Sequence, residues 1–171
     1  LIYFIVLSNM NINELEKDIQ KHKDKSPETY NDIVNISIPF YMFYNKMMEG
    51  VYNIEEQHGL SNSELDVLAS LIMSGNDEYI LSPTKLYERL LFTSAAITKV
   101  LKKLEDKKYI TRLDNEFDKR SKLVQITSLG KQICQQTLKE VLLYEEQCFS
   151  PLDQNEKDTF KKLLIKMMKN L

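Results

Sequence analysis

The side chains best suited to chemistry in this sequence are the hydroxyls and lysines that recur along residues 93–107. The apolar residues Ile97, Val100, Leu101 and Leu104 fall at the three- and four-residue spacing of one helix face. On the opposite face, small residues would let the backbone approach the major groove of DNA, and lysines would reach phosphates. A solvated lysine face on an ordinary amphipathic helix explains this segment equally well when it is taken alone. The candidate DNA contacts here are Thr93, Ser94, Ala95, Thr98, Lys99, Lys102 and Lys103.

A second candidate site is a basic loop between two short β-like runs, residues 109–113 and 122–126. An arginine at a loop tip can enter a narrow, strongly negative minor groove. Arg120 is preceded by Asp118, whose carboxylate could orient the guanidinium. For the loop alone, an exposed hairpin with a chance cluster of charges is the alternative. The candidate contacts are Asp118, Lys119, Arg120, Ser121 and Lys122, joined by Ser82 and Thr84 from an earlier predicted helix.

The distribution of charge favours a nucleic-acid partner more than the net charge does. The whole chain carries a net charge of −2. Residues 82–131 hold 12 Lys and Arg against 6 Asp and Glu, a net charge of +6, whereas the remainder holds 11 against 19, a net charge of −8. A compact basic stretch in an acidic chain is a local electrostatic footprint, although charges can also cluster by chance.

Helical periodicity predicts a mainly α-helical chain with a small β-wing. A long apolar stripe runs through residues 28–58, where Pro39 should kink or split the helix, and Gly59 should end it. Further helices are expected to begin after Ser, Thr or Asp caps at positions 61, 82, 93, 127 and 153. Four helices, two strands and two more helices are the order of a helix-turn-helix with a wing and long flanking helices.

The predicted organisation has three parts. Residues 1–27 are an N-terminal arm without a core element, in which residues 1–9 are expected to be an appended segment or a mis-set start. The winged helix-turn-helix lobe covers residues 61–127, and the flanking helices cover residues 28–60 and 128–171. With no export signal and no membrane-length apolar run, the expected compartment is the cytoplasm and no membrane partner is expected.

The wing region resembles a known family. Residues 118–131, D-K-R-S-K-L-V-Q-I-T-S-L-G-K, look like the wing-and-exit signature of the MarR (multiple-antibiotic-resistance regulator) family. Residues 104–112, L-E-D-K-K-Y-I-T-R, resemble that family's recognition-helix exit and first wing strand. The resemblance extends over roughly residues 30–170 and is most specific within residues 93–130.

The resemblance implies a bacterial, homodimeric transcription regulator, a repressor that reads near-palindromic double-stranded DNA and has neither enzymatic activity nor a cofactor. It implies that residues 93–99 lie in the major groove and Arg120 in the minor groove, with Asp118 positioning the arginine. One departure is that the family's usual Pro and second basic residue near the wing tip are replaced by residues 115–117, Asn-Glu-Phe. An acidic residue beside phosphates should weaken binding. Among the features that the resemblance implies, deep entry of the wing into the minor groove therefore has the least support.

Apart from the family resemblance, the pattern of apolar residues also supports a dimer. An apolar stripe that includes Met167, Met168 and Leu171 continues to the last residue, with no obvious partner segment in the chain. A second copy of the chain would bury this stripe. The alternative is that the stripe packs onto the helix at residues 28–58 of the same chain.

The sequence offers candidates for three kinds of signal-sensing site. Relatives of this type often bind a small aromatic effector between the dimer helices and the DNA-binding lobe, which makes Phe40, Phe43, Tyr44 and Met47 a candidate pocket. Ordinary core and dimer packing is the alternative.

Cys134 and Cys148 are 14 residues apart, about 21 Å along a continuous helix, which is too far for a bond between them. Reduced, inert thiols are expected, and a redox switch is the alternative. His22 and His58 lack the spacing of a zinc site, so no metal is expected.

Two other classes of protein compete with a DNA-binding regulator. A winged helix can serve purely as a protein–protein docking module, but such a module needs no basic helix combined with a basic wing. An all-α scaffold does not explain the two β-like runs. An enzyme is not expected, because the sequence has no P-loop, G-x-S-x-G, H-E-x-x-H or Gly-rich dinucleotide turn.

Overall fold

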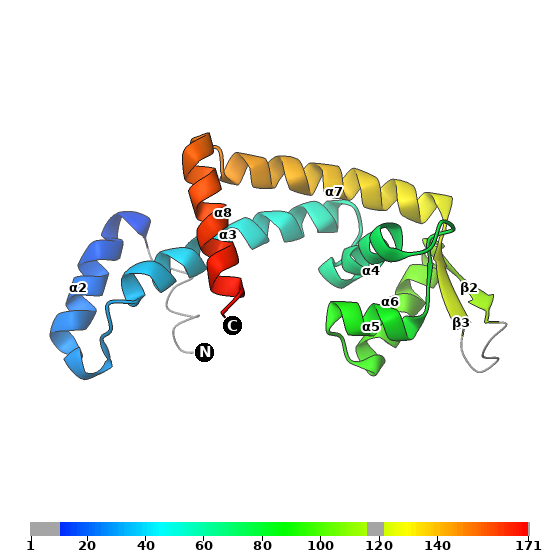
Figure 1. Cartoon of the computed structure of the whole chain (residues 1–171), viewed down its shortest axis with the longest axis horizontal. Helices are drawn as coiled ribbons and strands as arrows, with labels where there is room; N and C mark the ends of the chain where they lie inside the picture. The colour runs from blue at the N-terminus through cyan, green and yellow to red at the C-terminus, as the bar shows by residue number, and fades with distance from the viewer. Residues whose placement is uncertain (1–10, 116–121, 171) are drawn as a thin grey trace. The chain divides into compact units, whose positions relative to one another are not determined.

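The computed structural model describes residues 11–115 and 122–170. The chain forms two compact units, Leu1–Gly50 and Val51–Leu171. The long helix α3 (Val34–Gln57) begins in the first unit and ends in the second (Figure 1).

The first unit is helical and has a small core of its own. A 3₁₀ turn η1 (Ile12–Glu14) leads into α2 (Leu15–Lys25), and a second turn η2 (Pro27–Thr29) precedes α3. Leu15 and Ile19 of α2 are buried together with Ile38 of α3. The sequence prediction of an arm without a core element was therefore wrong for this segment, because two apolar residues one turn apart are enough to pack against α3.

The start of α3 also differs from the prediction. The side chain of Asn31 accepts a hydrogen bond from the main-chain N–H of Ile33, at 2.9 Å, and this turn delays the helix until Val34. Of the two predicted effects of Pro39, splitting of the helix is excluded, because α3 continues through Pro39 to Gln57. A kink at Pro39 stays a prediction. Gly59, with a φ of +67°, follows the end of the helix as predicted.

The second unit contains the predicted helix-turn-helix and wing. Its helices are α4 (Asn62–Ser74), α5 (Pro83–Leu90), α6 (Ser94–Asp106), α7 (Ser128–Cys148) and α8 (Gln154–Met168). Ser82, Thr93, Thr127 and Asp153 each accept a main-chain hydrogen bond as the N-cap of the helix that follows. These four predicted helix starts are confirmed, because a cap is a local interaction that the residue type largely dictates.

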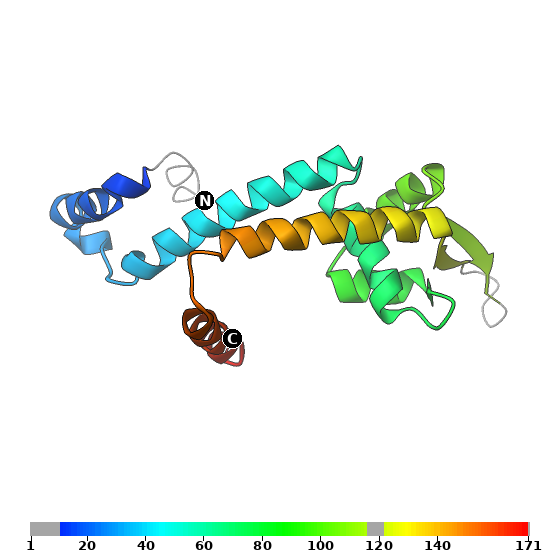
Figure 2. The same ribbon diagram turned by 90° about the horizontal axis from the view of Figure 1, so that it is seen from above.

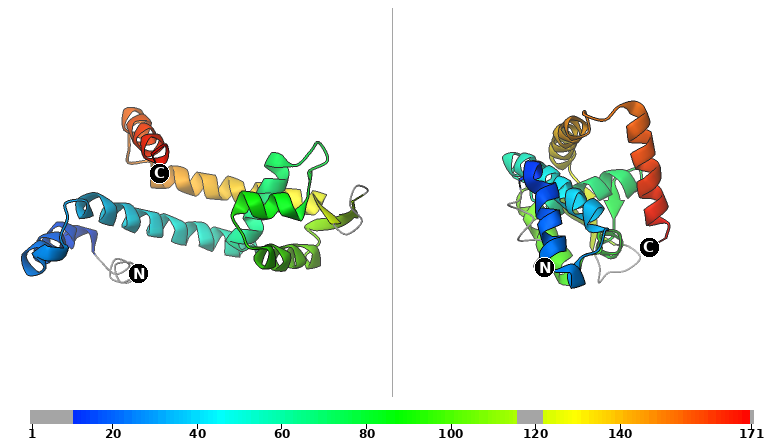
Figure 3. Two further views of the ribbon diagram at one scale, coloured as in Figure 1. Left: turned by 60° about the horizontal axis from the view of Figure 1, so that its bottom comes forward. Right: turned by 90° about the vertical axis from the view of Figure 1, so that its left-hand side faces the viewer.

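A three-stranded antiparallel sheet completes this unit. Its strands β1 (Ile80–Leu81), β2 (Ile110–Asp114) and β3 (Lys122–Ile126) lie in the order β1-β3-β2. Within it, Gln125 of β3 pairs with Ile80 on one side and Thr111 on the other. The β2–β3 hairpin extends away from helices α4 to α6 (Figure 3).

One apolar core joins helices α4, α5 and α6 to the sheet and to the start of α7. It is made of Leu60, Leu65, Val67, Leu68, Leu71, Leu81, Leu86, Ile97, Leu101, Leu104, Ile110, Val124, Ile126 and Cys134. From the sheet, α7 runs as one long helix to the turn before α8 (Figure 2). No described residue of α8 is buried, and the side chain of Met168 is 71% exposed.

Candidate nucleic-acid interface

The orientation of helix α6 is determined by its buried side. Ile97, Leu101 and Leu104 are almost completely buried in the core of the second unit. The hydroxyl oxygen of Thr93 accepts a hydrogen bond from the main-chain N–H of Ala96, at 3.2 Å, and so caps the helix. Because the buried face is held in this way, the opposite face of α6 must point to solvent.

That solvent face carries all seven α6 candidates from the sequence. Thr93, Ser94, Ala95, Thr98, Lys99, Lys102 and Lys103 are all exposed. Ala95, Thr98, Lys99 and Lys102 follow one another at helical spacing and form a single strip. In the part of the chain that the structure describes, none of the three lysines belongs to an ion pair. The strip therefore presents small side chains beside cationic groups that can bind phosphate.

Helix α5 offers fewer exposed candidate DNA contacts than α6 does. The hydroxyl of Ser82 accepts a hydrogen bond from the main-chain N–H of Lys85, at 3.2 Å, so this candidate residue caps α5, whereas Thr84 is exposed. Lys85 and Arg89 are also exposed on α5, four residues apart, and the sequence analysis did not single them out. Their place in the basic stretch at helical spacing was the signal that could have found them.

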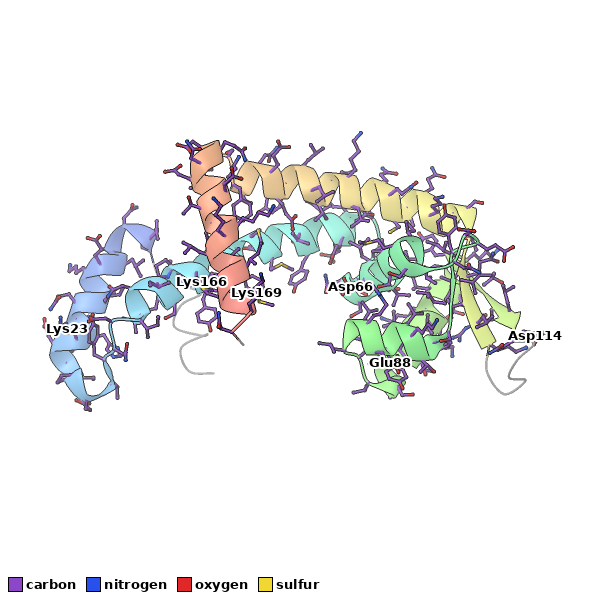
Figure 4. All side chains as sticks on the ribbon, viewed as in Figure 1. Lys23, Asp66, Glu88, Asp114, Lys166 and Lys169 are labelled. Atoms are coloured by element: carbon purple, nitrogen blue, oxygen red, sulfur yellow. The ribbon has the colours of Figure 1, made fainter. Side chains whose placement is uncertain are left out.

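Of the wing, the structure describes the base, which is formed by strands β2 and β3. Asp114 lies at the end of β2 (Figure 4). Lys122 begins β3 and forms an ion pair with Asp114, so its ammonium group is already opposite a carboxylate. The other wing candidates, Asp118, Lys119, Arg120 and Ser121, lie outside the described residues. Their roles stay predictions.

Thr127 attaches the wing to helix α6. Its main-chain N–H donates to the oxygen of Tyr109, at 2.9 Å, and its hydroxyl donates to the oxygen of Lys108, at 2.8 Å. The same hydroxyl oxygen accepts from the main-chain N–H of Gly130, at 3.0 Å. Thr127 therefore joins the exit of α6, the residue before the first wing strand and the start of α7.

The candidate sensing residues lie elsewhere. Phe40, Phe43 and Tyr44 are exposed and Met47 is half-buried on α3, all within the first unit, and their role as a pocket stays a prediction. Burial raises the pKa of the Cys134 thiol to about 11, so little of the reactive thiolate forms at neutral pH. Cys148 is half-buried near the end of α7.

Each histidine has a polar contact within the chain. His58 lies 2.9 Å from a carboxylate oxygen of Glu140, and His22 contacts the hydroxyl of Thr29. Among residues 11–115 and 122–170 there is no group of three or more potential ligands. Within the same residues, no helix is long and apolar enough to cross a bilayer.

The three-helix core, the small sheet and the outward-facing strip of α6 together define a winged helix-turn-helix protein. A model of the MarR family matches residues 58–121. The HTH-type transcriptional regulator PecS of Dickeya dadantii is 30% identical over 115 residues, which are 67% of this chain and 69% of PecS. The chain therefore belongs to the MarR family of transcription regulators.

Further similarities extend over most of the chain. The HTH-type transcriptional regulator PrsX of Escherichia coli is 28% identical over 164 residues, 94% of this chain and 96% of PrsX. The crystal structure of a mutant E. coli MarR complexed with operator DNA matches with a TM-score of 0.65 and 26% identity, covering 80% of this chain and 99% of that one. The sequence-based expectations of family and fold are thus confirmed.

Proposed function

We propose that this protein is a sequence-specific regulator of transcription that binds double-stranded DNA through α6 and the wing. The observation that carries this proposal is the exposed strip of α6, where Ala95 and Thr98 lie beside Lys99 and Lys102. Small side chains allow the helix backbone to come close to base edges, and the lysines neutralise flanking phosphates. The complex of the E. coli MarR mutant with operator DNA supports the same use of the fold.

We further propose that the protein acts as a homodimeric repressor on a near-palindromic operator. Apolar side chains are exposed at Ile33, just before α3, at Ile36 in its first turn, and along α8 at Leu163, Met167 and Met168. A second copy would bury such surfaces, and a two-fold dimer presents two copies of α6 to two half-sites. In this proposal residues 61–127 form the DNA-binding lobe and residues 28–60 and 128–171 form the dimer.

A small aromatic effector is part of this proposal. It would bind at Phe40, Phe43, Tyr44 and Met47 once the dimer has formed. Aromatic and methionine side chains adapt readily to flat apolar ligands, which supports this choice. Because bacterial DNA lies in the cytoplasm, the proposed function requires the protein to act there.

Selection from random duplex DNA at two salt concentrations tests the proposal. We expect enrichment of a palindrome with a steep salt dependence. Lys99→Met should lower the slope of log K against log salt by about 0.9, because one phosphate contact is lost. Lys161→Met, which removes one exposed charge from α8, is the matched control and should leave the slope unchanged. A winged-helix docking module would instead show no enrichment even at low salt.

A further inference from the structure

Lys107 lies at the C-terminal end of α6 and is used differently from the other lysines of this helix. Its ammonium group donates to a carboxylate oxygen of Glu64, at 2.7 Å, and to the main-chain oxygen of Gly59, at 2.8 Å. Lys103, one turn earlier, is exposed and has no ion pair within the described residues. Two neighbouring lysines on one helix therefore have different surroundings.

Glu64 is a strong anchor for Lys107. It lies in the first turn of α4 and is only 2% exposed. One of its carboxylate oxygens accepts from Lys107, and the other accepts from the main-chain N–H of Ser61, at 2.8 Å. Burial raises the pKa of Glu64, but the hydrogen bonds from Lys107 and Ser61 together outweigh it, so the pKa lies below its usual value of 4.5. The carboxylate is therefore ionised at neutral pH.

The pair lies where three helix ends meet. Gly59 follows the end of α3, Glu64 belongs to the start of α4, and Lys107 follows the end of α6. The end of α3 is bound to its neighbours by two more contacts. Asn62 donates to Glu55, at 3.0 Å, and His58 lies 2.9 Å from Glu140 of α7. The α3–α4 joint, residues 58–61 with the helix ends beside them, is thus held by several polar contacts. Among the described residues, Lys107 provides the polar side-chain contact from this joint to the end of α6.

We propose that Lys107, through Glu64 and the oxygen of Gly59, is a positioning residue that fixes the C-terminal end of α6 to the α3–α4 joint. This inference rests on the proposed function, because the orientation of α6 then sets how its exposed strip meets DNA. The cap at Thr93 holds the N-terminal end of α6, and Lys107 holds the other end. The alternative role for Lys107 is one more phosphate contact, like that proposed for Lys103.

The first test needs no DNA. Hydrogen exchange of the free protein is compared for the wild type, Lys107→Met and Lys103→Met. Lys107→Met should speed exchange at residues 59–64 and 104–110, whereas Lys103→Met should match the wild type. Glu64→Gln should show the same faster exchange, because glutamine still accepts from Ser61 in the capping box but has no charge to hold Lys107. This conservative variant keeps the test valid if Lys107→Met does not fold.

The second test measures DNA affinity over a range of salt. Lys107→Met should weaken binding about tenfold at every salt concentration while keeping the wild-type slope, since no phosphate contact is lost. Lys103→Met should instead lower the slope by about 0.9. The double variant Glu64→Gln with Lys107→Met should bind no more weakly than Lys107→Met alone, because both changes break the same interaction.

Two results would overturn the positioning role. One is a lowered salt slope for Lys107→Met, which would make Lys107 a phosphate contact. The other is unchanged exchange in α6 for both Lys107→Met and Glu64→Gln. If the wild type binds no DNA, the proposed function fails, and hydrogen exchange still decides whether Lys107 holds α6.

Discussion

The Cα of Gly130, in the first turn of α7, lies directly against the main-chain oxygen of Tyr109. A Cβ added at Gly130 would overlap this oxygen and approach a side-chain carbon of Ile126 to 3.0 Å. Both neighbours belong to strands or strand ends of the sheet, so neither can move without disturbing the wing. The close approach of α7 to the start of β2 therefore depends on glycine at this position.

Gly130→Ala should consequently lower the free energy of unfolding by about 1–3 kcal/mol, the usual cost of forcing an added carbon into a packed site. Thermal or urea unfolding followed by circular dichroism measures this change. Gly59→Ala is the comparison, because a Cβ there meets nothing within 4 Å and only the φ of +67° opposes it, at about 1 kcal/mol. Equal losses for the two variants would contradict the role given to Tyr109.

Leu91, in the turn between α5 and α6, has a backbone conformation that glycine adopts more easily. Its φ is +53° and its side chain is 91% exposed, so the left-handed conformation is not offset by packing within the chain. Leu91→Gly should raise the free energy of unfolding by about 0.5–1 kcal/mol, because the steric cost of the left-handed region disappears.

The melting temperature measures this gain. Glu88→Gly, at an exposed position inside α5, provides the control and should lower stability by about 1 kcal/mol. If Leu91→Gly also lowers the melting temperature, the leucine is stabilised by a contact that the turn geometry does not reveal.

Glu55, near the end of α3, should make stability depend on pH. Burial and the nearby charge of Asp66 raise the pKa of Glu55, although the hydrogen bond from Asn62 lowers it, and burial also raises the pKa of Asp66. The folded protein then holds protons that the unfolded chain releases. The stabilising contribution of protonated Glu55 is complete below its usual pKa of 4.5 and is lost as pH rises through the higher folded value.

Glu55→Gln should therefore be more stable than the wild type at pH 7, because glutamine still accepts from Asn62 without carrying charge. The difference should shrink toward zero below pH 4.5. Urea unfolding at both pH values measures it, with Glu56→Gln, an exposed neighbour, as the control. A difference that is the same at both pH values would mean that charge is not its cause.

Leu163 on α8 tests the proposed dimer. The side chain is exposed in the single chain, so Leu163→Glu should leave the fold of each protomer intact. In a dimer the added carboxylate would enter an apolar interface, and we expect at least a tenfold loss of dimer affinity, on the order of the cost of burying an unpaired charge. Light scattering after size-exclusion chromatography measures the mass, with the adjacent Lys162→Glu as the control. A wild type that elutes as a monomer would rule out this dimer.

The prediction from sequence succeeded where a short stretch of chain determines its own structure. The buried face of α6 follows from the spacing of Ile97, Leu101 and Leu104, and the cap at Thr93 is a bond between residues three apart. Its exposed strip was predicted for the same reason. The core formed by Ile19 and Ile38 was not predicted, because nothing local to α2 shows that α3 packs against it.

The sequence by itself therefore determined the order of the elements, the winged helix-turn-helix and the residues that α6 exposes. Only the tertiary structure decided how the charges are used. Within the basic stretch, the sequence counts Lys103 and Lys107 as equal positive charges, yet Lys107 is paired with Glu64, 43 residues away. A charge count depends on composition alone, whereas pairing depends on which helix ends the fold brings together, and that is set by packing of the whole core.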